Sequence, residues 1–243
     1  MAPGKMINFC ITVSFFWVGC TLPGNDPRRS RLQNGSMPNL PPSSPAAERN
    51  KQPIVEQLQQ LLPARGLMLE IAAGTGQHAV WFAAALPGWI WQPTDADPDA
   101  LTGISAWAAQ SGLSNVRSSL LLDVTATRWP SAGPPFTEPF DAIYCANMIH
   151  ISPWASCAAL LRGAVRHLAL DGIVVLYGPF LQDSVQTSPS NLAFDARLRE
   201  RNPQWGLRRL EDVVEQAHQV GLQLQSRREM PANNLLLVLG RGQ

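Results

Sequence analysis

The chain has 243 residues, of which 45% are hydrophobic and 15% are charged, so it can bury one substantial core and still carry a tail. Its formal net charge of +1 creates no overall field that would draw the whole protein to nucleic acid or to an anionic membrane. The four cysteines, Cys10, Cys20, Cys145 and Cys157, fit no metal-binding spacing. We therefore expect a cytoplasmic protein with reduced thiols and no metal site.

The first 43 residues differ in character from the rest of the chain. The apolar segment from Met6 to Gly19 has about fourteen residues, too few to span a bilayer as a helix but typical of a signal-peptide core. Residues 23–45 are rich in Pro, Ser, Asn and Gly, a composition typical of disorder. We interpret residues 1–43 as a disordered or extraneous tail. Export or lipid anchoring through Cys20 is the alternative.

Helices and strands are predicted to alternate from residue 44 onward, which defines a domain over residues 44–243. The helices are expected over residues 46–62, 79–86, 99–110, 153–168, 192–201 and 210–220, and the strands over residues 67–71, 89–94, 116–122, 140–146, 173–177, 222–230 and 234–239. The last two strands are separated only by Pro231-Ala232-Asn233, a turn so short that it can join only antiparallel neighbours.

Five parallel strands followed by a terminal antiparallel hairpin are the plan of class I methyltransferases, whereas a dinucleotide-binding fold would continue with parallel crossovers. The sequence therefore predicts an α/β fold with a seven-stranded Rossmann-like sheet in the order 3-2-1-4-5-7-6. Strand 7 is antiparallel, and helices cover both faces of the sheet.

The turn Gly74-Thr75-Gly76 lies between a predicted strand and a predicted helix and is the strongest functional signal in the chain. Glycines let a backbone approach a ligand closely, and a helix start offers free N–H groups. Two cofactor classes use such a corner, and Glu70 discriminates between them. A carboxylate there would repel the pyrophosphate of a dinucleotide but hold the ammonium of S-adenosylmethionine. We therefore predict S-adenosylmethionine as the cofactor, with Glu70, Gly74, Thr75 and Gly76 among its binding residues.

Further polar residues follow the next three strands, where ligands bind in such sheets. Asp95 follows the second strand and is expected to accept hydrogen bonds from both ribose hydroxyls. Asp123 follows the third strand and faces the adenine amino group, with Val124 packing on the ring. Alternatively, Asp95 is a carboxylate at a helix start and Asp123 forms a turn. Asn147 and His150 follow the fourth strand, where the methionine part and the acceptor meet.

Methyl transfer depends mainly on positioning, and a base is needed only if the acceptor loses a proton. His150 has an ordinary pKa of roughly 6.5, which suits a general base, so we predict it as the catalytic residue. A hydrogen-bonded histidine that steadies the loop is the alternative. Arg49, at the start of the first helix, is expected to bind the carboxylate of the donor or an anionic substrate. The acceptor side is expected to be lined by Tyr177, Phe180, Asn191 and Asn233.

Five blocks occur together in the chain: Ala46–Lys51, Glu70–His78, Cys145–Trp154, Tyr177–Phe180 and Met230–Asn234. In this combination the sequence, from residue 44 to its C-terminus, resembles the methyltransferase-like family long catalogued only as a domain of unknown function. The resemblance implies a class I S-adenosylmethionine-binding fold and no particular substrate.

The predicted function is methyl transfer from S-adenosylmethionine to an unidentified small-molecule acceptor, with no nucleic acid or membrane as partner. An S-adenosylmethionine-binding sensor without transferase activity is one alternative. An NAD(P)-dependent oxidoreductase is another, although the Tyr-x-x-x-Lys pair of short-chain reductases is absent because Lys51 is the last lysine.

Overall fold

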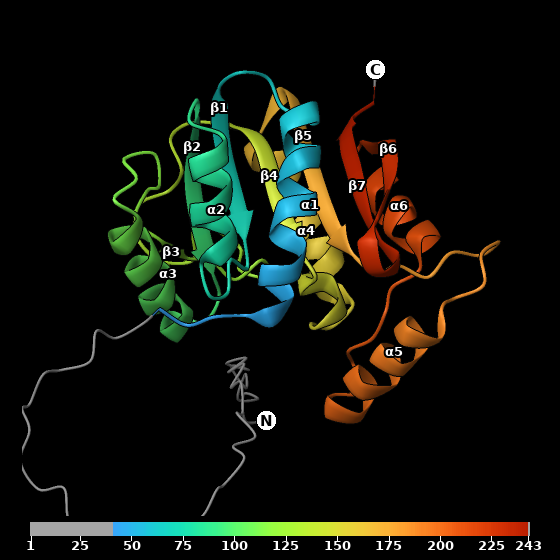
Figure 1. Ribbon diagram of the computed structural model, residues 1–243. Helices are drawn as coiled ribbons and strands as arrows, with labels where there is room; N and C mark the ends of the chain where they lie inside the picture. The colour runs from blue at the N-terminus through green and yellow to red at the C-terminus, as the bar shows by residue number, and fades with distance from the viewer. Residues whose placement is uncertain (1–40, 243) are drawn as a thin grey trace, which may run out of the picture.

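A computed structural model describes residues 41–242, which form a seven-stranded sheet with helices on both faces (Figure 1). The strands are β1 (Gly66–Ile71), β2 (Trp89–Asp95), β3 (Leu120–Leu121), β4 (Phe140–Ala146), β5 (Leu168–Gly178), β6 (Leu222–Met230) and β7 (Asn234–Arg241). Their order is β3-β2-β1-β4-β5-β7-β6, and β7 is antiparallel to both of its neighbours. The predicted strand order and terminal hairpin are confirmed. The expectations for residues 1–40, a tail with a signal-like segment, concern residues outside the described range.

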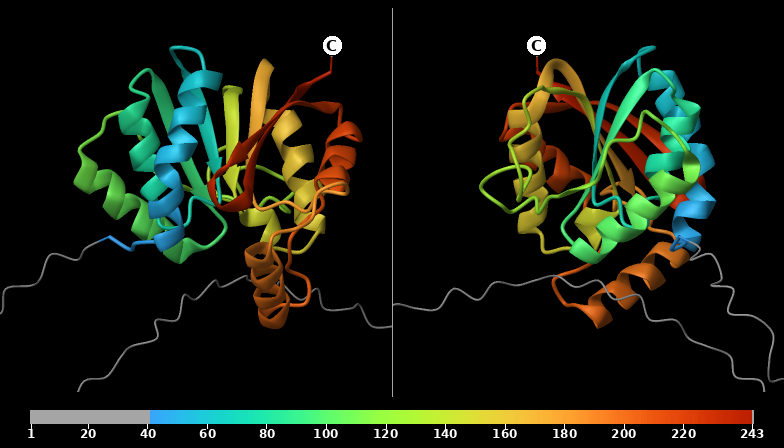
Figure 2. Two further views of the ribbon diagram at one scale, coloured as in Figure 1. Left: turned by 45° about the vertical axis from the view of Figure 1, so that its right-hand side comes forward. Right: turned by 90° about the vertical axis from the view of Figure 1, so that its left-hand side faces the viewer.

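Helices cover both faces of the sheet (Figures 1 and 2). The helices are α1 (Pro45–Leu61), α2 (Gln77–Ala85), α3 (Pro98–Ser111), α4 (Ala155–His167), α5 (Pro189–Arg201) and α6 (Leu210–His218). Apolar side chains of α1 and α2 pack on one face of the central strands, and those of α4 and α6 pack on the other. Helix α5 stands away from the sheet, beyond the carboxyl ends of the central strands.

The starts of α1 and α3 follow from their capping residues. The Ser44 hydroxyl accepts the Ala47 N–H at 3.3 Å, and a proline follows Ser44 at the first helical position. Asp97 does the same for α3, because its Oδ1 accepts the Asp99 N–H at 2.9 Å and Pro98 follows it. These caps place both helix starts at the carboxyl edge of the sheet, next to the glycine turn.

The third strand is much shorter than the predicted range of residues 116–122. Only Leu120 and Leu121 pair with β2, together with an isolated bridge from Val116 to Trp91. Between these points Pro93 has no N–H to donate toward β3, and the side chain of Gln92 donates to the Ser118 carbonyl at 2.9 Å instead. A proline in β2 therefore interrupts the ladder that the apolar pattern of residues 116–122 predicts.

Two other boundaries differ from expectation. Helix α4 begins at Ala155, and Ser152 does not cap it, because the Ser152 hydroxyl lies 3.4 Å from the Met148 sulfur and α4 has no side-chain cap. Strand β5 begins at Leu168, five residues before the predicted start at Ile173, and the residues in between form an irregularity in its pairing with β4.

The N-terminal end of the described range contacts the domain. The Pro42 carbonyl accepts the indole N–H of Trp107 in α3 at 2.8 Å, and Pro42 also lies against Gly103. Contacts with the fold therefore begin at least two residues before the predicted boundary at residue 44. No helix within residues 41–242 combines the length and the apolar character needed to cross a bilayer.

Candidate functional site

The glycine turn between β1 and α2 has the backbone conformation that its composition predicts. Ala72, Gly74 and Gly76 have positive φ values of 56°, 58° and 86°. A Cβ atom on Gly76 would lie 2.7 Å from the Ile104 Cα atom, so glycine is required for α3 to pack against the turn. Gly74 is exposed, with open space where its side chain would be. The turn therefore presents bare backbone at the sheet's switch point, between β1 and β4.

The Asp95 side chain at the end of β2 is bonded to this turn. Its Oδ2 accepts the Gly74 N–H at 2.8 Å, and its Oδ1 accepts the Asp97 N–H at 3.0 Å. Burial raises the pKa of the Asp95 carboxyl, and the bonds from these backbone N–H groups act in the opposite direction. Asp97 caps α3 instead, so the two neighbouring carboxylates have separate structural positions.

Glu70 does not face the ligand side, contrary to the expectation from the sequence. It is 2% exposed, and its Oε2 accepts the indole N–H of Trp91 at 2.6 Å. Side chains alternate along a strand, so Glu70 shares the face of Met68, beneath α1 and α2. Burial raises the pKa of Glu70 to about 8, which favours the protonated carboxyl.

The start of α1 is held over the glycine turn by Gln77, the first residue of α2. The Gln77 Oε1 accepts the Ser44 N–H and, at 3.1 Å, the Thr75 hydroxyl. The Gln77 Nε2 donates to Glu48 at 3.2 Å. Thr75, a predicted cofactor residue, is thus connected to α1 through a buried amide.

His78 forms a second link between α1 and the site. Its Nε2 lies 2.7 Å from the Asn50 Oδ1, and its Nδ1 lies 3.4 Å from the Tyr144 hydroxyl. Burial lowers the pKa of His78 to about 4, so the ring is neutral. Burial raises the pKa of Tyr177, while a hydrogen bond from Asn50 and the charge of Arg49 act in the opposite direction. Arg49 is exposed and lies near Tyr177, at the side predicted for the acceptor.

The residues after β3 form a turn at the same edge. The Asp123 Oδ1 accepts both the N–H and the hydroxyl of Thr125, at 2.8 and 2.7 Å. Val124 is 8% exposed and belongs to the core. Asp123 therefore has the local bonds of a turn former, and it also lies one strand beyond Asp95, at the position predicted for adenine recognition.

The residues after β4 are covered by a segment much later in the chain. Asn147 has a φ of 60°, and its N–H donates to the Tyr177 carbonyl at 2.8 Å. The His150 carbonyl accepts the Gly206 N–H at 2.9 Å. The Arg208 guanidinium donates to the carbonyls of Ile149 and Ser152, at 2.9 and 2.7 Å. This places His150, with 0% exposure, beneath residues 205–208.

The tautomer of His150 follows from its contacts. Its Nδ1 accepts the Arg208 backbone N–H at 3.3 Å. Burial, together with the Arg208 charge, lowers the pKa of His150 to about 3, so the ring is neutral. A neutral imidazole that accepts at Nδ1 carries its proton on Nε2. This Nε2 has no hydrogen-bond partner within residues 41–242, and a Cβ atom on Gly178 would lie 2.4 Å from it. His150 is held as a donor, with no free lone pair to accept a proton.

Three of the four predicted acceptor residues line one cavity of about 200 Å³. Phe180 follows β5, Asn191 lies in the first turn of α5, and Asn233 lies in the turn between β6 and β7. Asn191 donates to the Asn233 carbonyl at 3.0 Å, and Phe180 packs edge-on against His150 at a centroid distance of 5.0 Å. Tyr177 lies outside this cavity, nearer to α1.

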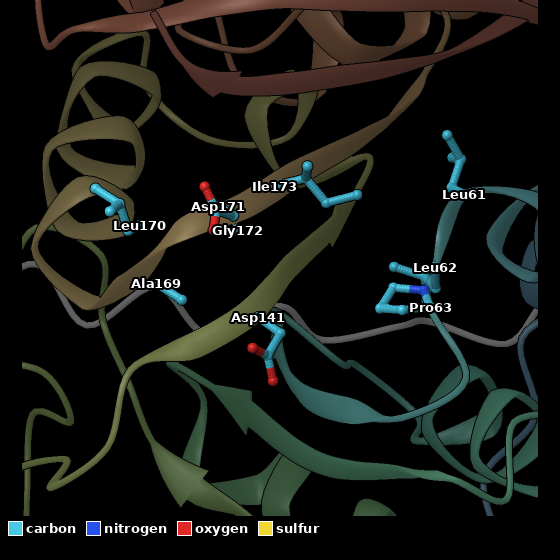
Figure 3. A pocket seen from close by; sticks show the side chains of 9 residues that line it. All are labelled: Leu61, Leu62, Pro63, Asp141, Ala169, Leu170, Asp171, Gly172 and Ile173. Carbon is cyan, nitrogen blue, oxygen red and sulfur yellow. The ribbon is translucent and has the colours of Figure 1, made fainter. Parts of the chain in front are cut away.

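A second cavity, of about 310 Å³, lies at the opposite edge of the sheet (Figure 3). Figure 3 shows the end of α1 across from the start of β5, with Asp141 of β4 between them. The Asp141 Oδ2 accepts the Leu67 N–H at 2.7 Å, so this carboxylate is used to fix the start of β1. The cavity is at the amino ends of the strands, away from the glycine turn.

Comparison with known proteins identifies the family of this chain and structures with a similar fold. The model of the family described as "Protein of unknown function (DUF938)" matches residues 41–241. The chain belongs to the DUF938 family. Solved structures similar to this DUF938 protein include the pyocyanin biosynthetic protein PhzM, with a TM-score of 0.64 and 20% identity over 81% of this chain and 56% of PhzM.

Two further structures show the same fold. One is CalO1, a methyltransferase of calicheamicin biosynthesis, in an S-adenosylhomocysteine-bound form, with a TM-score of 0.68 and 12% identity over 81% of this chain and 54% of CalO1. The other is an O-methyltransferase family 2 protein from Planctomyces limnophilus in complex with apigenin, with a TM-score of 0.66 and 18% identity over 81% of this chain and 60% of that one. The DUF938 protein thus spans little more than half of each. The Rossmann-like class I methyltransferase fold is confirmed.

Some residues of the DUF938 site have little signal in the sequence. Gln77 and His78 join α1 to the glycine turn, His78 through Asn50, and the only signal of Gln77 and His78 is that they stand inside one of the five sequence blocks. Arg208 has a weaker signal, because it stands among other arginines that look like a solvated face. Its guanidinium is instead half-buried and bonded to backbone carbonyls.

Proposed function

We propose that this DUF938 protein is an S-adenosylmethionine-dependent methyltransferase that acts on a small-molecule acceptor. The observation that carries the proposal is the bond between the Asp95 carboxylate and the Gly74 N–H, at the end of β2 and over bare backbone. A carboxylate at this place accepts the two hydroxyls of a ribose, and the glycine turn admits the rest of the nucleoside. The similar structures of CalO1 with S-adenosylhomocysteine bound and of the Planctomyces limnophilus protein with apigenin bound support the proposal.

The donor-binding residues divide along the sheet edge. Gly74, Thr75 and Gly76 contact the centre of the donor through backbone, and Asp95 binds its ribose. Asp123 and Val124, one strand further out, take the adenine. On the other side, Asn147 and Arg49 hold the methionine part, with Arg49 as the free cation for its carboxylate. Glu70 supports this arrangement indirectly, by fixing Trp91 beneath the turn.

The donor supplies an electrophilic methyl group, and the protein's task is to align an acceptor with it and to exclude water. We assign His150 a positioning role in place of general-base catalysis, because its Nδ1 is engaged and its Nε2 carries a proton. The imidazole holds residues 205–208 over the end of β4 and supports Phe180 at the acceptor side. An acceptor that ionises readily, or reacts without losing a proton before transfer, suits such a site.

Titration calorimetry with S-adenosylhomocysteine and with NAD tests the cofactor assignment. We expect micromolar-scale affinity for S-adenosylhomocysteine and none for NAD; tighter binding of NAD would refute the proposal. Incubation of cell metabolites with methyl-labelled donor, comparing the wild type with Gly76→Val, tests the activity. In the variant the added side chain meets the Ile104 backbone and closes the turn. Donor binding without a labelled product would assign a binding protein with no transferase activity.

A further inference from the structure

The cavity beside Phe180 has a hydrogen-bonding character that identifies a class of acceptor, if the proposed function holds. It lies between Phe180, the start of α5 and the β6–β7 turn, and we refer to it as the amide cavity because Gln182, Gln186, Asn191, Asn233 and Asn234 line it. We propose that the amide cavity binds a nitrogen-bearing, hydrogen-bond-donating group of the acceptor, an amine or an amide, and excludes carboxylates and phosphates.

The orientation of two asparagines leaves their carbonyl oxygens free. The Asn191 side chain donates to the Asn233 backbone carbonyl at 3.0 Å, and that of Asn234 donates to the Pro231 carbonyl at 2.9 Å. A carbonyl partner requires the NH₂ group, so each Oδ1 is the atom left over. Neither Oδ1 takes part in a hydrogen bond within residues 41–242. Two side chains that line the cavity therefore each have a carbonyl oxygen available as a hydrogen-bond acceptor.

The charge of the lining points in the same direction. Glu229 is the ionisable residue among those that line the cavity, and no lysine, arginine or histidine does. Of the nearby cations, Arg209 forms an ion pair with Asp183, and Arg227 donates to the Oε1 of the lining residue Gln182 at 2.6 Å. An anionic group in the cavity would be repelled by the Glu229 carboxylate that lines it. An ammonium or a neutral N–H group would be matched.

The start of α5 does not supply an anion site here. Ser188 caps the helix, because its hydroxyl accepts the Asn191 N–H at 3.3 Å and its carbonyl accepts the Leu192 N–H at 3.0 Å. Pro189, the first helical residue, has no N–H. Most of the donors that a helix start offers to an anion are therefore absent or already used.

The size and place of the cavity fit one end of an acceptor molecule. Its volume of about 200 Å³ and the apolar walls at Phe180, Met230 and Leu235 suit a small group with an apolar body. Leu235 of β7 pairs with Gly178 of β5, and β5 is next to β4. The cavity wall at Leu235 is therefore two strand spacings, about 10 Å, from the end of β4, where the methyl group would be transferred. The cavity anchors the acceptor while another atom reaches the donor.

Binding of a matched probe pair tests the inference on the full chain. 2-Phenylethylamine and 3-phenylpropionate have similar apolar bodies and opposite charges. Each is titrated into ¹⁵N-labelled protein, with and without S-adenosylhomocysteine, while the side-chain amide signals of Asn191 and Asn234 are followed. We expect the amine to shift these signals and to bind at least tenfold more tightly than the carboxylate. Equal or tighter binding of the carboxylate, or amine-induced shifts confined to other residues, would overturn the proposal.

Two variants distinguish binding in the amide cavity from a general effect of the protein's charge. Glu229→Gln should weaken 2-phenylethylamine by about 2- to 5-fold, as expected for an exposed carboxylate, and should leave 3-phenylpropionate no weaker. Glu215→Gln removes an equally exposed carboxylate on α6, outside the cavity, and should change neither probe. An equal loss in both variants would contradict a specific site. Because the probes are also titrated without S-adenosylhomocysteine, a failure of donor binding would count against the proposed function and not against the amide cavity.

Discussion

Replacement of Asp95 by alanine should weaken donor binding far more than it weakens the fold. In the proposed complex this carboxylate accepts both ribose hydroxyls. A hydrogen bond to a charged group contributes about 1.5–3 kcal/mol, which corresponds to a roughly 10- to 150-fold loss of affinity. The effect on unfolding is smaller, because the variant loses the bonds from Gly74 and Asp97 but also removes a carboxylate whose burial is unfavourable.

Asp97→Ala is the matched control, since Asp97 is two residues away and also half-buried. It caps α3 through the Asp99 N–H, and loss of an N-cap costs about 1 kcal/mol of stability. The two variants should therefore show opposite patterns. Asp95→Ala loses donor affinity, whereas Asp97→Ala loses stability and keeps donor affinity within about twofold.

Titration calorimetry with S-adenosylhomocysteine measures the first effect, and urea unfolding measures the second. If Asp97→Ala weakened the donor more than Asp95→Ala, the ribose contact would belong to the other carboxylate. If neither variant changed the affinity, the bond between Asp95 and Gly74 would be purely structural, and the proposed function would lose the observation that carries it.

Three further predictions concern buried groups and the N-terminal boundary. The pKa of Glu70 rises from 4.5 to about 8 on folding, so between these pH values the folded state holds a proton that the unfolded state has released. The Glu70 contribution to stability therefore falls by about 1.4 kcal/mol per pH unit in this range. Glu70→Gln, compared with the wild type by urea unfolding at pH 5.5 and 8.5, should remove this fall, and an unchanged dependence of the unfolding free energy on pH would contradict it. His150→Gln should lower turnover by less than tenfold with an unchanged pH–rate profile, whereas a general base would cost roughly 10²–10⁴-fold. Deletion of residues 1–40 should leave the Tm unchanged. Deletion of residues 1–43 also removes the Pro42 carbonyl that accepts the Trp107 indole N–H, and should lower the free energy of unfolding by about 0.5–1.5 kcal/mol. Equal Tm values for the two deletions would contradict a stabilising role of this contact.

The strand order is predictable from the sequence because it depends on local features. A three-residue turn between the last two strands permits only an antiparallel pair, and glycines with polar residues mark the strand ends. The failure at the third strand is also local, but its cause lies in the neighbouring strand. Pro93 cannot donate to residues 116–122, so the Gln92 side chain donates to the Ser118 carbonyl, and the apolar pattern of residues 116–122 alone does not report this.

The orientation of Glu70 could have been derived from the alternation of side chains along β1. Met68 and Glu70 share a parity, as do Leu69 and Ile71, and Met68 lies under α1 and α2. A carboxylate on that face enters the core. The position of Glu70 along the strand is therefore not sufficient to predict its role, because the face of the strand decides what the side chain meets.

The burial of His150 could not be derived in this way. It depends on residues 205–208, which fold back onto the β4 end and bond to His150 through the Gly206 and Arg208 N–H groups. No local pattern around His150 reports a contact with a segment so distant in the chain. The residue type and its place after a strand both suggest a base, and only the long-range contact shows that Nδ1 is engaged.

The two halves of the proposed site are therefore built differently. The donor side consists of strand ends and helix starts, and its polar contacts form around one turn, as in the bond from Gly74 to Asp95. The proposed acceptor side combines the turn between β6 and β7 with residues 180–209, which leave the sheet after β5 and return over His150. Because residues 180–209 contribute none of the predicted donor contacts, substitutions there can change the acceptor while the donor site remains intact. Specificity for the acceptor should thus be determined by the amide cavity and the residues around α5, and the glycine turn should tolerate no such variation.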